Sequence, residues 1–421
     1  MKPIQTSICP SNISSDSTAY HSQTNFYKER AKQLHSSIPV IDAHNDLAGE
    51  LLLRHQHGER DVIRRLYLPH WKASGFQLIV SSIYIENAVF YPRANSDLLN
   101  GCSQLHSTFS PNTEKTWNDY WNDGTLCWEQ GFENALAQIE VIKEEIQELS
   151  QEICLITTKR ELEEIKGNQK IGILLYMEGL DCIGSDLDKI HILYQLGVRG
   201  ASLTWSRPNL LATGCCTATK FQDIPGQITH LGYRAIQELQ RHGMFLDISH
   251  LNNEGWEQVN NLFSNQQAGK EASSAPFLPY IATHSDAYSI YPNYRNLTDN
   301  QMQALAKQGG IMGFNACKYI VGYSGTDTGS NSLHCLDAMC CHIEYAVELI
   351  GASHVGLGFD LCDSYTRGKY QNENIEPEDC LENHKKALLL TSRLLERGMP
   401  EQTVLRIIGL NWLEYFEHLL H

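Results

Sequence analysis

The sequence predicts an α/β fold, a (β/α)8 barrel of the TIM type formed by a single domain with an insertion after its second strand. Two observations lead to this prediction. Short apolar runs rich in Ile, Val and Leu recur along the 421 residues, and stretches with helical periodicity lie between them. Eight strands that alternate with helices in one chain are typical of this barrel.

Each apolar run has the features of a buried parallel strand. The runs are mostly too short for helices, and apolar residues occupy both faces of the expected pleat. They lie at residues 39–44, 77–84, 171–177, 200–205, 244–250, 279–284, 309–315 and 354–360.

Helical patterns precede the fourth, fifth, seventh and eighth runs, and two more follow the last run. Gly243 ends one of these patterns and is an expected C-cap. The patterns cover residues 187–197, 233–243, 298–310, 336–351, 381–398 and 400–420.

Composition divides the chain into an extension, a main domain and an insertion. Residues 1–37 are polar and are expected to form an N-terminal extension with helical character, whereas residues 38–421 contain all eight expected strands. Residues from about 86 to 131 are rich in Asn, Ser, Thr and Trp and fit the alternating pattern poorly. We expect this segment to be an insertion that lies over one face of the barrel.

Charge and composition argue against several classes of partner. The 33 basic and 49 acidic residues give a net charge of −16, which disfavours the phosphates of nucleic acids and anionic membranes. The N-terminal residues lack the apolar core of a secretory signal, and no run of 18 apolar residues occurs. The 13 cysteines, an odd number, indicate free thiols. We therefore expect a cytoplasmic protein without nucleic-acid or membrane partners.

Polar residues stand at the carboxyl ends of the expected strands, where barrels of this type carry their catalytic groups. Taken singly, each has an ordinary explanation, because a lone histidine is commonly a core residue and a lone acid commonly caps the next helix. The set comprises His44, Asp46, Glu178, Trp205, His250, His284 and Asp360.

Three histidines and three acids at one barrel mouth predict a metal site. Crowded carboxylates repel one another and lose hydration, and a divalent cation removes that cost. Five nitrogen and oxygen ligands exceed what one tetrahedral zinc needs and suit two cations that share a bridging carboxylate. His44 and Asp46 lie two residues apart at the end of the first expected strand, so in extended backbone their side chains point to the same side.

The motifs at these strand ends resemble those of the membrane dipeptidase family, also called renal-type dipeptidases, among the amidohydrolase-like metal barrels. The resemblance runs from about residue 38 to 418 and lies in the order and spacing of IDAHND, MEG, LDISH, ATHSDAYS…YRN and HVGLGFD. It implies a dipeptidase with two divalent metal ions, expected to be zinc, although cobalt, manganese or iron also suit such ligands. It further implies a dipeptide substrate, tolerance of a D-residue at its C-terminal position, and the homodimer that is common in that family.

The resemblance assigns the metal ligands. It makes His44 and Asp46 ligands of the first cation, Glu178 the bridge between both cations, and His250 and His284 ligands of the second.

The resemblance also assigns two residues that act on water and substrate. Asp360 matches the acid that handles the proton of the attacking water, and Arg295, in YRNLTD, matches the arginine that holds the terminal carboxylate of the substrate. A guanidinium suits that task because it donates two parallel hydrogen bonds. From the residues alone, a surface salt bridge is the simpler explanation of Arg295.

Trp205 departs from the family pattern. The family often has LTH at the end of the fourth strand, with a histidine that contacts the scissile carbonyl oxygen, and this chain has LTW. The indole offers one N–H donor to the substrate, or the ring packs as a wall of the pocket. Two alternatives follow: an amidohydrolase acting on a non-peptide amide, lactone or cyclic amide, and a metal-bound barrel with little activity.

Overall fold

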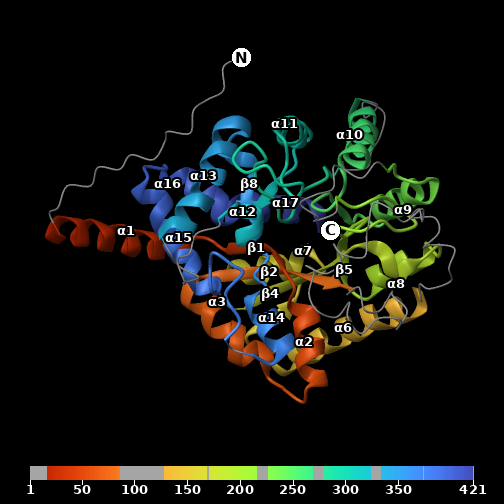
Figure 1. Ribbon diagram of the computed structural model, residues 1–421. Coiled ribbons are helices and arrows are strands. Elements are labelled where there is room, and N and C mark those ends of the chain that lie inside the picture. The colour runs from red at the N-terminus through yellow and green to blue at the C-terminus, as the bar shows by residue number, and fades with distance from the viewer. Residues whose placement is uncertain are drawn as a thin grey trace.

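The computed structural model of the protein describes seven stretches of the chain (Figure 1). They are residues 17–85, 128–167, 170–215, 226–268, 278–323, 333–372 and 374–420. Most of the expected insertion, residues 86–127, and the first 16 residues of the expected extension lie outside the described residues. The domain boundaries therefore stay a prediction.

A parallel sheet with the strand order β1-β2-β4-β5-β6 lies at the centre of the molecule, with helices around it (Figure 1). Nearly every residue of these strands is buried. Burial on both faces explains why the strands read as continuous apolar runs. The strands are β1 (Val40–Asn45), β2 (Phe76–Tyr84), β4 (Ile171–Glu178), β5 (Val198–Ser202) and β6 (Phe245–Asp247).

Backbone hydrogen bonds carry the sheet onward from β6 and back to β1. Residues 281–282 bridge in parallel to β6 on one side and to β7 (Met312–Phe314) on the other. Strand β7 pairs with β8 (Val355–Leu357), and the N–H of Asp360, just after β8, donates to the carbonyl oxygen of His44 at 3.2 Å. The predicted α/β barrel is confirmed.

Two strands differ from the prediction. Residues 279–284 make isolated bridges instead of a regular strand, because the N–H of Thr283 donates to the side chain of Asp247 at 3.0 Å rather than to a neighbouring backbone. Strand β3 (Ile153–Leu155), which was not predicted, pairs with the start of β4. Its three residues are too few to stand out as an apolar run.

The predicted helices are present. Helix α11 (Asp299–Gln308) begins with a capping box between Thr298 and Gln301 and ends at Gly309, whose φ of 88° is left-handed. The other helices are α2 (Leu47–Gln56), α3 (Leu68–Ser74), α6 (Trp128–Glu148), α7 (Lys159–Lys166), α8 (Asp188–Gln195), α9 (His230–Arg241), α10 (Asn253–Ala268), α12 (Lys318–Val321), α13 (Leu333–Ile350), α14 (Asp363–Tyr370), α15 (Ala387–Glu396), α16 (Glu401–Leu405) and α17 (Asn411–Leu419). None of the helices in the described ranges is long and apolar enough to cross a membrane.

Helix α1 (Ser17–Ser37) runs along the outside of the barrel beside α15 and α16 (Figure 1). Its apolar residues Ala31 and Leu34 are buried, and Arg30 Nη2 donates to Glu401 Oε2 at 2.6 Å. The end of the expected extension is thus helical and packs against the main domain.

A column of aromatic rings connects α17 with the barrel interior. Trp412 of α17 is fully buried, and its indole N–H donates to the carbonyl oxygen of Leu357 at 2.9 Å. The ring of Phe416 lies 6.3 Å from that of Phe245, which lies 5.7 Å from that of Tyr176. These rings belong to one buried cluster in the interior of the barrel.

Candidate metal centre

Strand β1 and the turn that follows it place His44 and Asp46 together, as their spacing predicts. Asp46 precedes helix α2 but makes no side-chain cap to it. Its Oδ1 atom instead lies 3.4 Å from Nε2 of His44 and accepts a hydrogen bond from the hydroxyl of Ser82 on β2. Asp46 therefore faces the barrel mouth and not the helix.

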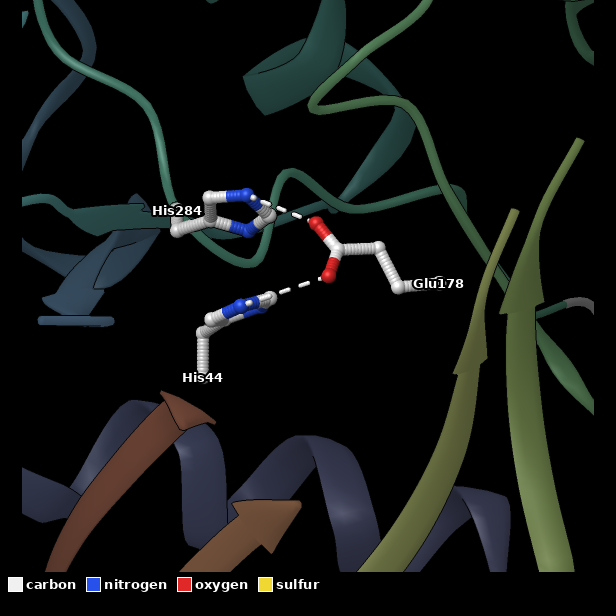
Figure 2. Close-up of side chains that lie close together, drawn as sticks. All are labelled: His44, Glu178 and His284. Atoms are coloured by element: carbon white, nitrogen blue, oxygen red, sulfur yellow. Dashed lines mark ion pairs between the residues drawn. The ribbon is translucent and has the colours of Figure 1, made fainter. Parts of the chain in front are cut away.

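Glu178, the last residue of β4, lies between three histidines. Its Oε1 atom is 2.9 Å from Nε2 of His250 and 3.4 Å from Nε2 of His284, and its Oε2 atom is 3.7 Å from Nε2 of His44. Figure 2 shows the two carboxylate oxygens directed toward His284 and His44. All four side chains are at least 95% buried, with Glu178 exposing 3% of its side chain.

The glycine of the MEG motif, Gly179, is required by its backbone conformation and by its close neighbours. Its φ of 82° is left-handed, and a Cβ atom there would lie 2.5 Å from Oδ2 of Asp181 and 2.9 Å from the backbone N of Trp205. Only glycine lets the chain turn away directly after Glu178 while the loop after β5 packs against it.

Asp360 reaches the same cluster from the end of β8. Its φ of 54° is left-handed, a conformation that Asp tolerates better than most residues. Oδ1 lies 3.4 Å from Nε2 of His44, and Oδ2 accepts a hydrogen bond from Nδ2 of Asn315 at 2.9 Å. The side chains of Asp46 and Asp360 are 18% and 16% exposed, so they form the outer edge of the cluster.

Hydroxyl groups contact the second ring nitrogen of each of the three histidines. The Tyr176 hydroxyl contacts Nδ1 of His44, Ser206 Oγ lies 2.7 Å from Nδ1 of His250, and Thr283 Oγ1 lies 2.8 Å from Nδ1 of His284. These hydroxyls leave each Nε2 for the centre of the cluster, as outer partners of metal-binding histidines do. None of the three hydroxyl residues was predicted from the sequence, although Tyr176 lies two residues before Glu178 and so shares its face of β4.

Burial and neighbouring charges shift the pKa values of the side chains in the cluster. Burial opposes a charge on His44, but the nearby carboxylates, Glu178 foremost, outweigh it and raise the pKa of His44 to about 10. Burial raises the pKa of the Glu178 carboxyl well above its usual range, and lowers the pKa values of His250 and His284 well below theirs. Burial therefore favours neutral imidazoles at His250 and His284, the form that binds metals.

The donor set fits divalent cations. Nε2 of His44 is buried and has no hydrogen-bond partner among the described residues, and Nε2 of His250 lies 2.9 Å from Nε2 of His284. A cation accepts such nitrogen lone pairs and offsets the charge of the carboxylates around them. Two groups of three residues each bring their possible ligand atoms within 4.8 Å of one another. One group is His44, Glu178 and His284, and the other is His44, Asp46 and Asp360.

Arg295 lies behind the two histidines of the far strands. Its side chain is buried, and the guanidinium donates hydrogen bonds to the carbonyl oxygens of Ser249 and, at 3.1 Å, His284. Its positive charge contributes to the lowered pKa of His250, after burial. The arginine is thus part of the barrel mouth and does not form a surface salt bridge.

Trp205 forms a wall beside the cluster. Its ring stacks on that of His250, with centroids 5.6 Å apart and planes inclined by 30°, and also lies 5.3 Å from the ring of Tyr84. The guanidinium carbon of Arg207 lies 5.5 Å from the same indole. The indole therefore packs directly against one histidine of the cluster.

Asp42 and His384 form a buried pair beneath His44. Asp42 Oδ2 lies 2.8 Å from Nε2 of His384, and Asp42 Oδ1 accepts a hydrogen bond from the N–H of Phe359 at 2.9 Å. His384 was not singled out from the sequence, because it lies 342 residues from its partner and outside every strand-end motif. The pair ties β1 to the segment after β8.

Comparison with known proteins gives relatives over nearly the whole chain. A dipeptidase, verJ of Clonostachys rogersoniana, is 23% identical over 393 residues, which cover 92% of this chain and 86% of that protein. A solved metallopeptidase from Rhodobacter sphaeroides, bound to a phosphinate mimic of L-Ala-D-Ala, matches with a TM-score of 0.70, 23% identity and coverage of 90% and 99% of the two chains. The solved dipeptidase AC, a metallopeptidase of family M19, matches with a TM-score of 0.69 and 23% identity. The match covers 91% of this chain and 99% of that chain.

A match to a whole family of proteins shows the family of this chain. The pattern of membrane dipeptidases, peptidase family M19, matches residues 28–419. The match contains all the strands and every residue of the cluster, and the solved structures share the fold. The chain therefore belongs to the membrane dipeptidase family, peptidase family M19, and is a hydrolase of the metallopeptidase type.

Proposed function

We propose that the protein hydrolyses free dipeptides at a centre that holds two divalent cations, with zinc as the expected ion. The position of Glu178 carries this proposal, since one carboxylate oxygen faces His250 and His284 while the other faces His44. A carboxylate that presents its two oxygens to separate sets of nitrogens suits a bridge between two cations.

The ligands divide around that bridge. His44 and Asp46 would hold one cation, and His250 and His284 would hold the other. Bound cations lower the pKa of a water molecule and polarise a carbonyl group. The protein contributes the fixed direction of each Nε2 and a barrel mouth in which charges interact more strongly than in water.

Asp360 is the proposed proton carrier. Asn315 donates to Oδ2, so Oδ1 remains directed toward His44 and the outer edge of the cluster. In this proposal, Oδ1 accepts the proton of the attacking water and delivers it to the departing amine. The partial exposure of Asp360 lets it reach a substrate at the mouth.

Arg295 is the proposed anchor of the substrate carboxylate. A guanidinium has five N–H donors, and those not directed at the carbonyl oxygens of Ser249 and His284 can bind a carboxylate. Such an anchor favours free dipeptides over longer or amidated peptides. The relative bound to an L-Ala-D-Ala mimic supports including a D-residue at the C-terminal position.

A second candidate is hydrolysis of a non-peptide amide, lactone or cyclic amide. The stacking of Trp205 on His250 favours it, because a bulky indole stands where the resembling family often has a histidine. A substrate panel separates the candidates: L-Ala-L-Ala, L-Ala-D-Ala, their C-terminal amides and a cyclic dipeptide, each assayed before chelation, after chelation and after zinc is restored. Zinc-dependent hydrolysis of free dipeptides supports the first proposal. Undiminished activity after metal removal contradicts both.

A further inference from the structure

Asp247, at the end of β6, accepts four hydrogen bonds from two residues. Oδ1 accepts from the backbone N–H of Ser249 at 3.0 Å, from its hydroxyl at 2.6 Å, and from the N–H of Thr283 at 3.0 Å. Oδ2 accepts from the hydroxyl of Thr283 at 2.8 Å. The carboxylate is 98% buried and is surrounded by donors, so both hydroxyl protons point toward it.

The same two hydroxyls contact His284 with their lone pairs. Ser249 Oγ accepts the backbone N–H of His284 at 3.2 Å, and Thr283 Oγ1 lies 2.8 Å from Nδ1 of its ring. A hydroxyl has a single proton to donate. Because the hydroxyl proton of Thr283 is directed to Asp247, Nδ1 of His284 must be the donor in its contact with Thr283 Oγ1.

We infer that Asp247, acting through Thr283, fixes His284 with its proton on Nδ1, so that Nε2 presents a lone pair to a divalent cation. This inference rests on the proposed metal centre. It makes Asp247 and Thr283 positioning residues, which touch neither substrate nor cation and act through the ligand. The contact at His250 differs, because Ser206 Oγ faces the thiol of Cys215 at 3.7 Å and either atom can donate.

The test compares zinc binding by purified full-length variants. Protein stripped of metal is titrated with Zn²⁺ against a chromophoric chelator, and cobalt substitution reports the ligand field by its visible spectrum. We expect Thr283→Val to weaken one zinc equivalent about 10- to 100-fold and Thr283→Ser to restore it, as for other outer partners of metal ligands. Thr204→Val is the matched control, because the Thr204 hydroxyl is buried and has no partner among the described residues.

Wild-type zinc affinity and cobalt spectrum in Thr283→Val overturn the inference. If that variant does not fold, ¹⁵N-histidine spectra of the metal-free wild type decide, with His284→Asn to assign the signal. A proton on Nδ1 of His284 supports the inference, and a proton on Nε2 overturns it. Binding of one zinc by the wild type contradicts the two-cation proposal but leaves the effect of Thr283 on the ion held by His284 measurable.

Discussion

Oε1 of Glu178 lies 2.9 Å from Nε2 of His250, and both side chains are almost completely buried. A carboxylate and an imidazole so close share either a proton or a cation. Burial lowers the pKa of His250 well below its usual range, which favours the neutral imidazole, the form that binds cations. We therefore expect the proposed metal centre to depend on Glu178.

Glu178→Gln should remove the bridge while keeping the shape of the side chain. We expect loss of at least one zinc equivalent and a fall in kcat of more than about 100-fold, since even outer partners of metal ligands contribute 10- to 100-fold. Metal content by mass spectrometry and dipeptide turnover measure both. Glu133→Gln, at an exposed position, is the control. Full metal content together with full activity would rule out a bridging role.

Asp360→Asn should separate metal binding from turnover. The variant keeps a side chain that can pair with Asn315 but loses the acceptor for the proton, so we expect unchanged zinc content and a fall in kcat of about 10²- to 10⁴-fold. Asp188→Asn, at an exposed position, is the control. An active Asp360→Asn enzyme removes this residue from the proton transfer.

Substitution of Trp205 distinguishes a wall from a hydrogen-bond donor. The stacking on His250 depends on a flat ring, so Trp205→Phe should keep kcat within a few-fold, whereas Trp205→Ala should raise KM. Steady-state kinetics on the best dipeptide measure both effects. A fall in kcat of about 10²- to 10³-fold in Trp205→Phe would show instead that the indole N–H donates to the oxyanion.

His35 should make the fold less stable in mild acid. Burial, which outweighs its hydrogen bond to the carbonyl of Ser74, lowers the pKa of His35 from 6.5 to about 4. Between these values the unfolded chain binds a proton that the folded chain does not, so the free energy of unfolding falls as the pH falls, by up to about 1.4 kcal/mol per pH unit.

His35→Gln tests this prediction, because glutamine can also donate to Ser74 and accept from Thr391 but does not titrate. Urea unfolding of both proteins at pH 7, 6 and 5 should show a shallower loss of stability in the variant. Equal losses in the two proteins would show that His35 does not contribute.

The pair of Asp42 and His384 should stabilise the fold. His384→Ala leaves a fully buried carboxylate without this partner, and breaking such a pair costs about 3–5 kcal/mol. His384→Asn, which keeps a donor, should lose less. Denaturant unfolding at neutral pH measures both variants, and a loss below about 1 kcal/mol in His384→Ala is inconsistent with this role.

The strand ends could be predicted because they depend on local pattern. A buried strand that ends in histidine or an acid places that side chain at the barrel mouth, and the structure brings His44, Asp46, Glu178, His250, His284 and Asp360 together there. A regular strand was predicted at residues 279–284, but these residues make only isolated bridges. The side chain of Asp247 accepts the N–H of Thr283 in place of one ladder hydrogen bond.

The contacts that orient these side chains could not be predicted, because they join distant segments. Ser206 reaches His250 across 44 residues, and Asn315 reaches Asp360 across 45. The left-handed φ of Asp360 likewise depends on how β8 joins β1. Alternation of residues along a strand contains none of this information.

The proposed function depends on two cations that lie on either side of Glu178. Anomalous difference maps at the zinc edge, from crystals of the zinc-loaded protein, test it most directly. We expect two peaks about 3.5–4 Å apart, as in other two-metal sites, with the Glu178 carboxylate between them and the Nε2 atoms of His44, His250 and His284 around them. A single peak, or a pair of peaks that Glu178 does not bridge, would contradict the account.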